Sequence, residues 1–225
     1  MKTCRKFALP FLAAVCTLAC VTPASAGVIY SNIEPGDTFG PGVAIGLEPF
    51  GGPYNYAGIG FVSSQNYTFE SMELAVSLFS GPNVLDVDLM SSMGGLPNQV
   101  LESFTLNGDM STDSATGLVT IDSVTHPLLE AGQVYWVVAA GGSTTTAFWA
   151  ENSNGVEGPN VSGPSLTSLV RDANTNTVEA IEVSGNPVPE PGSWILMGGA
   201  LLLGTAYSYR RVTMGSTRAA LRAGK

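Results

Sequence analysis

Two aspartates, Asp86 and Asp88, have the residue type and the spacing of a site for a hard cation. They alternate with Leu85, Val87 and Leu89, so both carboxylates face the same side of a predicted strand. Carboxylate oxygens in this arrangement suit calcium, although the segment does not match the twelve-residue calcium loop. The alternative, which we favour, is a solvated acidic face that keeps a sheet edge from aggregating.

His126 is the only histidine of the chain, and it precedes Pro127, which favours an extended backbone near the start of a turn. A Ser-His-Asp arrangement would need this histidine and a Gly-x-Ser-x-Gly elbow, which residues 27–187 lack. Arg171 is the one cation in that range that could stabilise an oxyanion. We therefore expect no catalytic residue and an exposed loop position for His126. A carboxylate pair of the glycosidase kind is the alternative.

Aromatic residues that could stack on sugar rings fall in two predicted strands: Trp136 and Tyr135 in one, Trp149 and Phe148 in the other. Trp136 shares a face with Val134 and Val138, which indicates a core position rather than a binding platform. Tyr54 and Tyr56, in a Gly/Pro-rich stretch, are better placed to contact solvent.

The charge of residues 27–187 is strongly acidic. They hold seventeen Asp and Glu against one basic residue, although the whole chain is −9. Nucleic acid and anionic lipid surfaces are therefore not expected partners of this part, because binding phosphates needs clustered Lys or Arg. All three cysteines lie within the first 26 residues, so the rest of the chain can form no disulfide and no Cys-based zinc site.

The elements expected to position these residues are strands. Period-two alternation or short apolar runs bounded by Gly, Pro and Asn predict strands at 71–79, 85–89, 100–106, 118–124, 134–140, 145–151, 166–171 and 178–183. Residues 36–60, rich in Gly, Pro and Tyr, are predicted to be a loop with two short edge strands. No helical pattern separates the strands, so we predict an all-β fold, an antiparallel β-sandwich of the jelly-roll-like kind over 27–187.

The first 26 residues have the organisation of a secretory signal peptide. Lys2, Arg5 and Lys6 precede an apolar stretch, and Ala24-Ser25-Ala26 is a small-residue cleavage site. The mature chain is expected to begin at Gly27. The alternative is lipidation at Cys20, because Leu18-Ala19-Cys20 partly matches a lipobox.

A second targeting segment follows the predicted domain at residues 188–211. Val188-Pro189-Glu190-Pro191 is followed by an uncharged run of 17 residues, 193–209, and then by Arg210 and Arg211. The run is just long enough for a membrane-spanning helix of about 25 Å. Basic residues after it, continuing through the tail 212–225, predict that the domain lies outside and the tail in the cytoplasm.

This order of Pro-Glu-Pro, apolar run and arginine pair resembles the PEP-CTERM sorting signal of bacteria that secrete exopolysaccharide. The resemblance implies recognition and cleavage near the motif by a membrane enzyme, the exosortase. The motif residues it assigns are Val188, Pro189, Glu190, Pro191, Arg210 and Arg211. Fourteen residues, 212–225, follow the arginines here, whereas family members usually end soon after them.

Three further stretches, 94–102, 127–138 and 147–152, resemble in order and spacing the choice-of-anchor domains that often precede such signals. That resemblance implies an exported β-sandwich.

Together these features predict an exported, non-catalytic envelope or extracellular-matrix protein. The expected partners are the secretion machinery, the exosortase-like enzyme, the inner membrane before processing, and extracellular polysaccharide. No cofactor is expected apart from calcium as a candidate ligand. The rival is a secreted, carboxylate-dependent hydrolase.

Overall fold

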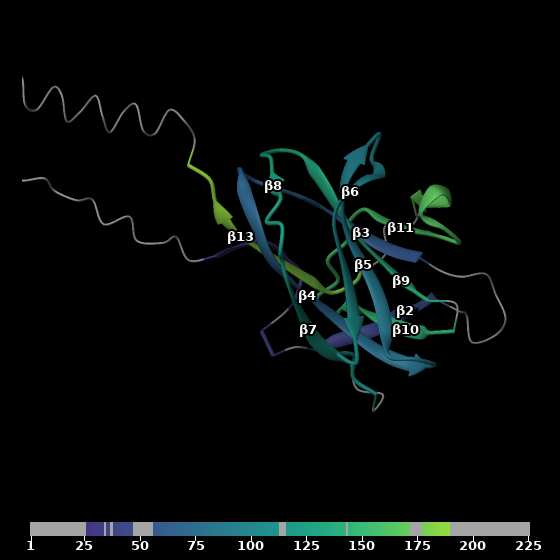
Figure 1. Cartoon of the computed structure of the whole chain (residues 1–225). Coiled ribbons are helices and arrows are strands. Elements are labelled where there is room, and N and C mark those ends of the chain that lie inside the picture. The colour runs from purple at the N-terminus through teal and green to yellow at the C-terminus, as the bar shows by residue number, and fades with distance from the viewer. Residues whose placement is uncertain are drawn as a thin grey trace, which may run out of the picture.

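The protein is described here by a computed structural model that covers residues 26–189 except 34, 37, 47–55, 113–115, 143 and 172–176. The described residues form antiparallel strands arranged in two sheets, with one 3-10 turn and no α-helix among them (Figure 1). The fold is therefore all-β, as predicted, and its two sheets share one core in the manner of a β-sandwich.

The first sheet has seven strands in the order β1-β13-β4-β10-β2, with β7 and β8 also paired to β4. Its members are β1 (Gly27–Ser31), β2 (Phe39–Gly46), β4 (Tyr67–Ser80), β7 (Gly117–Asp122), β8 (Leu128–Leu129), β10 (Thr146–Asn152) and β13 (Ile181–Pro187). The long β4 pairs with β13, β10, β7 and β8 along its length, so it organises this sheet.

The second sheet has six strands in the order β12-β11-β3-β9-β5-β6. They are β3 (Tyr56–Val62), β5 (Val84–Met93), β6 (Leu96–Asn107), β9 (Val134–Gly141), β11 (Asn160–Gly163) and β12 (Val170–Arg171), with the 3-10 turn η1 (Leu166–Ser168) before β12. Gly94 and Gly95, at φ 63° and 80°, form the tight turn between β5 and β6, where positive φ at both positions matches the strand twist.

The main core lies between the sheets and is built by alternation along the strands. Met72, Leu74 and Val76 of β4 face Leu85, Val87 and Leu89 of β5, and all six belong to one buried cluster. The intervening Asp86 is exposed. This period of two, read from the sequence, correctly predicted both strands.

A smaller apolar cluster covers the other face of β9. Tyr135, Val137 and Ala139 point into the main core, whereas Trp136 and Val138 pack with Met90, Val161 and Leu169. Because β9 is buried on both faces, its sequence is a continuous apolar run rather than an alternating one.

Two sequence predictions are wrong in this part of the chain. Residues 166–171 were expected to form one strand but form η1 and the two-residue β12. The predicted strand at 178–183 begins later, at Ile181. Residues 178–180 instead form backbone hydrogen bonds with the end of β10. The Asn152 amide donates to the Val178 carbonyl, and the Ala180 amide donates to the Ala150 carbonyl.

The described part of the stretch 36–60, which was predicted to be a loop with two short edge strands, contains β2 and most of β3. β2 is an edge strand, as expected, but β3 lies in the interior of the second sheet between β11 and β9. Its glycines make room for neighbours. A Cβ at Gly60 would lie 3.0 Å from Pro159 Cγ and 3.2 Å from the Trp136 ring, and one at Gly58 would lie 2.9 Å from the Val137 carbonyl oxygen. Glycine here is therefore a packing requirement of a strand.

Candidate functional site

The last strand leads directly into the predicted sorting segment. Pro187, the final residue of β13, pairs with Tyr67, and the Val188 amide donates a 2.8 Å hydrogen bond to the Asn66 carbonyl. β13 itself is held on both sides, by β1 and by β4. Val188 is therefore tied to the sheet, and Pro189, which is exposed, is the last described residue before the segment continues.

The two ends of the described chain leave the domain at the same end. Gly27, the first residue of β1, pairs with Gly185 of β13, two residues before that strand ends. Figure 1 shows both ends departing on the same side, at the left of the view. Ala26, the residue before the predicted cleavage point, is exposed there.

The segment that follows β13, which begins with Val188 and Pro189, is similar to a known sorting signal. Residues 187–211 match the PEP-CTERM protein-sorting motif. The match begins at the last residue of β13, so the PEP-CTERM motif starts where the fold ends. A comparison with curated proteins finds no match for the chain.

Several predicted positions lie outside the described residues. These are the signal-peptide residue Ala24, the motif residues Glu190, Pro191, Arg210 and Arg211, and the predicted span 193–209. Within the described part of the chain, no helix is long and apolar enough to cross a membrane.

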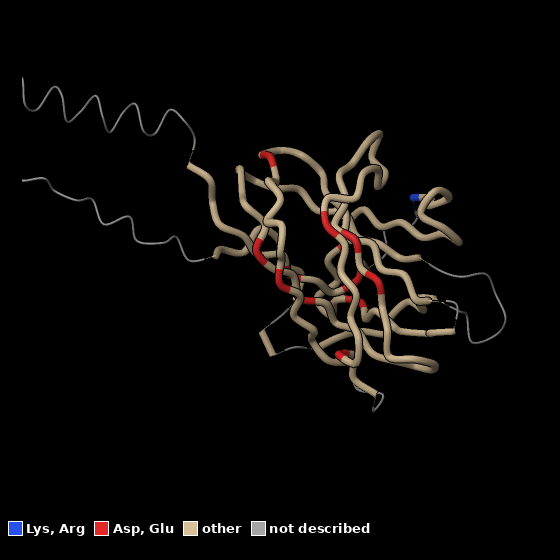
Figure 2. The backbone as a smooth tube through the Cα atoms, in the orientation of Figure 1, with Lys and Arg blue, Asp and Glu red and all other residues tan. Residues whose placement is uncertain are grey.

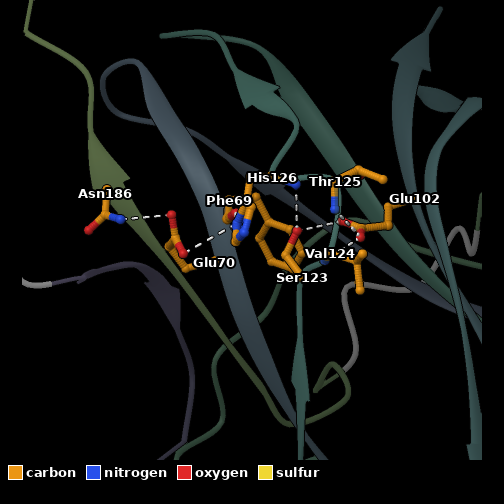
Figure 3. A network of polar contacts seen from close by, with 8 residues as sticks. All are labelled: Phe69, Glu70, Glu102, Ser123, Val124, Thr125, His126 and Asn186. Carbon is orange, nitrogen blue, oxygen red and sulfur yellow. Dashed lines mark hydrogen bonds and ion pairs between the residues drawn. The ribbon is translucent and has the colours of Figure 1, made fainter.

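Beside the PEP-CTERM exit lies a polar network that connects three strands and a turn (Figure 3). The Asn186 side chain of β13 donates a 2.7 Å hydrogen bond to Glu70 Oε1 of β4. The other oxygen of Glu70 lies 3.3 Å from His126 Nδ1, which is also 3.2 Å from the Phe69 carbonyl oxygen. The strand that carries the motif is thus fixed to β4 by side chains as well as by the backbone ladder.

The network continues to Glu102 on β6 of the opposite sheet. Ser123 Oγ accepts a 2.9 Å hydrogen bond from the His126 amide and donates one of 2.6 Å to Glu102 Oε2. Glu102 Oε1 accepts hydrogen bonds from the Val124 and Thr125 amides at 2.7 and 2.9 Å. Burial alone would raise the pKa of Glu102, but these hydrogen bonds outweigh it and lower the pKa below its ordinary value.

His126 differs from its predicted backbone conformation. Its φ is +48°, the one positive value at a non-glycine residue in the described chain, whereas an extended conformation was expected. The contacts of its amide and ring with Ser123, Phe69 and Glu70 hold it there. The side chain is 46 % exposed, in agreement with the predicted loop position. Among the described residues, the polar partners of its ring are the Phe69 carbonyl oxygen and the Glu70 carboxylate.

Asp86 and Asp88 lie on the outer face of the second sheet. As predicted, both point to the same side, and each carboxylate is paired across the strands with a hydroxyl of β6. Thr105 Oγ1 donates to Asp86 Oδ1 at 2.8 Å and Ser103 Oγ donates to Asp88 Oδ1 at 2.6 Å. No group of three or more metal-ligating side chains occurs among the residues that the structure describes.

The two tryptophans among the described residues, Trp136 and Trp149, are core residues, as predicted for Trp136. Both are fully buried, and their indole nitrogens donate to Ser92 Oγ (from Trp136, 3.2 Å) and to the Ala180 carbonyl (from Trp149, 3.0 Å). Tyr56 is part of β3 and packs against the cluster around Trp136, so its predicted loop position is wrong. Tyr54 lies outside the described residues.

Sequence reasoning missed one pairing of two glutamates. The backbone of Glu151, near the end of β10, forms an antiparallel bridge with that of Glu179, whose side chain is 3 % exposed. Burial raises the pKa of Glu151. The two residues are 28 positions apart, so no local pattern connects them, and only the return of the chain to β10 brings them together.

Proposed function

We propose that this protein is an exported, non-catalytic envelope or extracellular-matrix protein that an exosortase-type enzyme sorts and processes. The observation that carries the proposal is the PEP-CTERM match at 187–211, which begins where the last strand ends. That motif supports export and membrane-associated sorting before processing. Passage through the secretion machinery is part of the proposal. The signal peptide over residues 1–26 and an outer-envelope or extracellular destination belong to the proposal.

The domain is proposed to be a choice-of-anchor, jelly-roll-like sandwich that faces an exopolysaccharide matrix. Two antiparallel sheets with a shared core support this assignment. The stretches that carry the family resemblance form the turn before β6 with the first half of that strand, β8 with most of β9, and β10. The acidic surface, with one cation among the described residues at Arg171 (Figure 2), favours polysaccharide and calcium over polyanions as candidate ligands.

The experiment is carried out in the native host. Pro189→Ala combined with Pro191→Ala is expected to leave uncut protein in the inner-membrane fraction, because the rigid extended peptide that the enzyme recognises is lost. Pro164→Ala, in a loop after β11, is the matched control and is expected to be processed normally. Normal processing of the double variant would contradict the proposal.

A second candidate, a carboxylate-dependent hydrolase, is supported by Glu151, whose pKa is raised by burial and whose backbone pairs with that of Glu179. Glycosidases use a carboxyl group with a raised pKa as their general acid. Turnover of a polysaccharide panel by residues 27–187, abolished in Glu151→Gln, would establish this alternative. Turnover that persists in Glu151→Gln would exclude this pair as its source, and binding without turnover would favour the non-catalytic role.

A further inference from the structure

Two asparagines in the chain are followed directly by glycine, Asn107 by Gly108 and Asn154 by Gly155. Asparagine is thermolabile because the backbone nitrogen of the next residue can attack its side-chain amide carbon. Glycine favours this attack, since it has no Cβ to obstruct the approach and has the least restricted backbone. The two pairs are alike in sequence, but they differ in the structure.

The first pair is held in a hydrogen-bonded turn. Asn107 is the last residue of β6 and pairs with Val84 of β5. Its amide donates a 2.9 Å hydrogen bond to Asp109 Oδ2, and the Gly108 amide donates one of 2.8 Å to the Asn83 carbonyl oxygen. The nitrogen that would attack the Asn107 side chain is therefore already bonded to another residue and fixed in position.

The second pair lies at the tip of the turn that follows β10. Asn152 closes the base of this turn, because its side-chain amide donates to the Val156 carbonyl at 2.9 Å and its Oδ1 accepts from the Val156 amide at 2.8 Å. The same side chain donates a 2.8 Å hydrogen bond to the Val178 carbonyl, which fixes the base to the rest of the fold. The turn is thus anchored at residues 152 and 156, on either side of Asn154 and Gly155.

The reacting groups at the tip are accessible. Asn154 and Gly155 are both exposed, and nothing lies within 4 Å of a Cβ added to Gly155. Among the residues that the structure describes, no hydrogen-bond partner is found for the Gly155 amide or for the Asn154 side chain. The φ of Gly155 is 70°, which glycine adopts without strain. The attacking nitrogen can therefore lose its proton to solvent and approach the side chain.

We propose that Asn154 is a site of spontaneous deamidation in the folded protein and that the fold protects Asn107. The Gly155 nitrogen loses its proton to water and bonds to Cγ of Asn154. The side-chain amide group leaves as ammonia, so a five-membered succinimide ring forms. Water then adds to one of the two carbonyl carbons of the ring. Breaking one of its C–N bonds gives aspartate, and breaking the other gives isoaspartate, in which the main chain runs through the side-chain carbon.

Both products carry a negative charge where Asn154 had none. They add it to residues 27–187, which already hold seventeen Asp and Glu against one basic residue. The isoaspartate product also lengthens the main chain of the turn by one carbon. This inference goes beyond the proposed function, because the reaction needs only the folded chain and water.

The glutamates of the chain allow the two sites to be measured separately. Cleavage after glutamate releases residues 152–157, which contain Asn154, and residues 103–130, in which Asn107 is the one asparagine. Protein freshly purified from its native host is incubated in mildly alkaline buffer, one sample folded and one unfolded in guanidinium chloride. Mass spectrometry then follows the replacement of NH2 by OH in each peptide, and fragment spectra separate Asn154 from Asn152.

An encoded aspartate serves as the reference for the product. The variant Asn154→Asp yields the peptide 152–157 with an ordinary aspartate at that position. A second product of equal mass but different retention time, formed in the wild type, is expected and identifies isoaspartate. A wild-type product that contains aspartate alone would contradict the succinimide route.

Conversion in the folded protein is expected to be severalfold faster at Asn154 than at Asn107, and the two rates should approach each other in guanidinium chloride. Equal rates in the folded protein, or no conversion at Asn154, would overturn the proposal. A difference that stays as large in the unfolded chain would assign it to the neighbouring residues in the sequence rather than to the fold, and would overturn it as well.

Discussion

The Ser123 hydroxyl donates a 2.6 Å hydrogen bond to the Glu102 carboxylate, and this contact joins the two sheets. Glu102 belongs to β6, an edge strand of the second sheet, and Ser123 follows β7 of the first. Glu102 is 7 % exposed and is satisfied by one hydroxyl and two amides. A buried, inward-pointing charge on an edge strand also opposes pairing with another chain.

Replacing Glu102 by Gln is expected to lower the free energy of unfolding by about 1–3 kcal/mol at pH 7, because a charged acceptor is lost from a buried site. Chemical denaturation of residues 27–187 measures this. Ser103→Ala, which removes a donor on the exposed face of the same strand, is the control and is expected to cost less.

The same residue should make stability depend on pH. Because the folded state lowers the pKa of Glu102, its contribution is present above the ordinary glutamate pKa and is lost as the pH falls through the folded value. The stability difference between wild type and Glu102→Gln should therefore shrink on acidification. A difference that stays constant from pH 7 down to about pH 3 would contradict this account.

Two glutamates face each other on neighbouring strands of the first sheet. Glu182 of β13 pairs directly with Glu73 of β4, and like charges in such positions repel. Glu182→Gln is expected to raise stability by about 0.2–1 kcal/mol at low salt, with the gain reduced at high salt. Glu130→Gln removes the same charge at an exposed turn, and a gain as large in that control would mean that net charge is the cause.

The glycines of β3 offer a packing test. Gly58→Ala is expected to destabilise the domain by about 1–3 kcal/mol, because the new methyl group would meet the Val137 carbonyl oxygen and the Val138 side chain, each 2.9 Å away. Gly142→Ala is the matched control, since nothing lies within 4 Å of its added Cβ. Similar melting temperatures for the two variants would mean that β3 packs less closely than described here.

These glycines also explain which parts of the fold could be predicted from the sequence. Strands β4 and β5 place alternate apolar residues in the main core, so the alternation of residue types predicted them correctly. β3 could not be recognised, because Gly58 and Gly60 resemble turn residues until Trp136 and Pro159 are placed against them. The two residues of β12 are too few to form a pattern.

The candidate site also has a part that the sequence predicts and a part that it does not. The PEP-CTERM motif is contiguous, so residues 188–211 could be identified from their order alone. The contacts that fix its first residues depend on pairs far apart in the chain, Val188 with Asn66 and Asn186 with Glu70. No local sequence pattern contains such pairs.

The most direct test of the account is the intact mass of the mature protein from its native host. Processing at both ends predicts a chain that begins at Gly27 and ends before Trp194, so that Arg210 and Arg211 are absent. A mass that extends to Lys225 would contradict sorting by an exosortase-type enzyme, and a lipidated chain that begins at Cys20 would contradict the proposed signal cleavage.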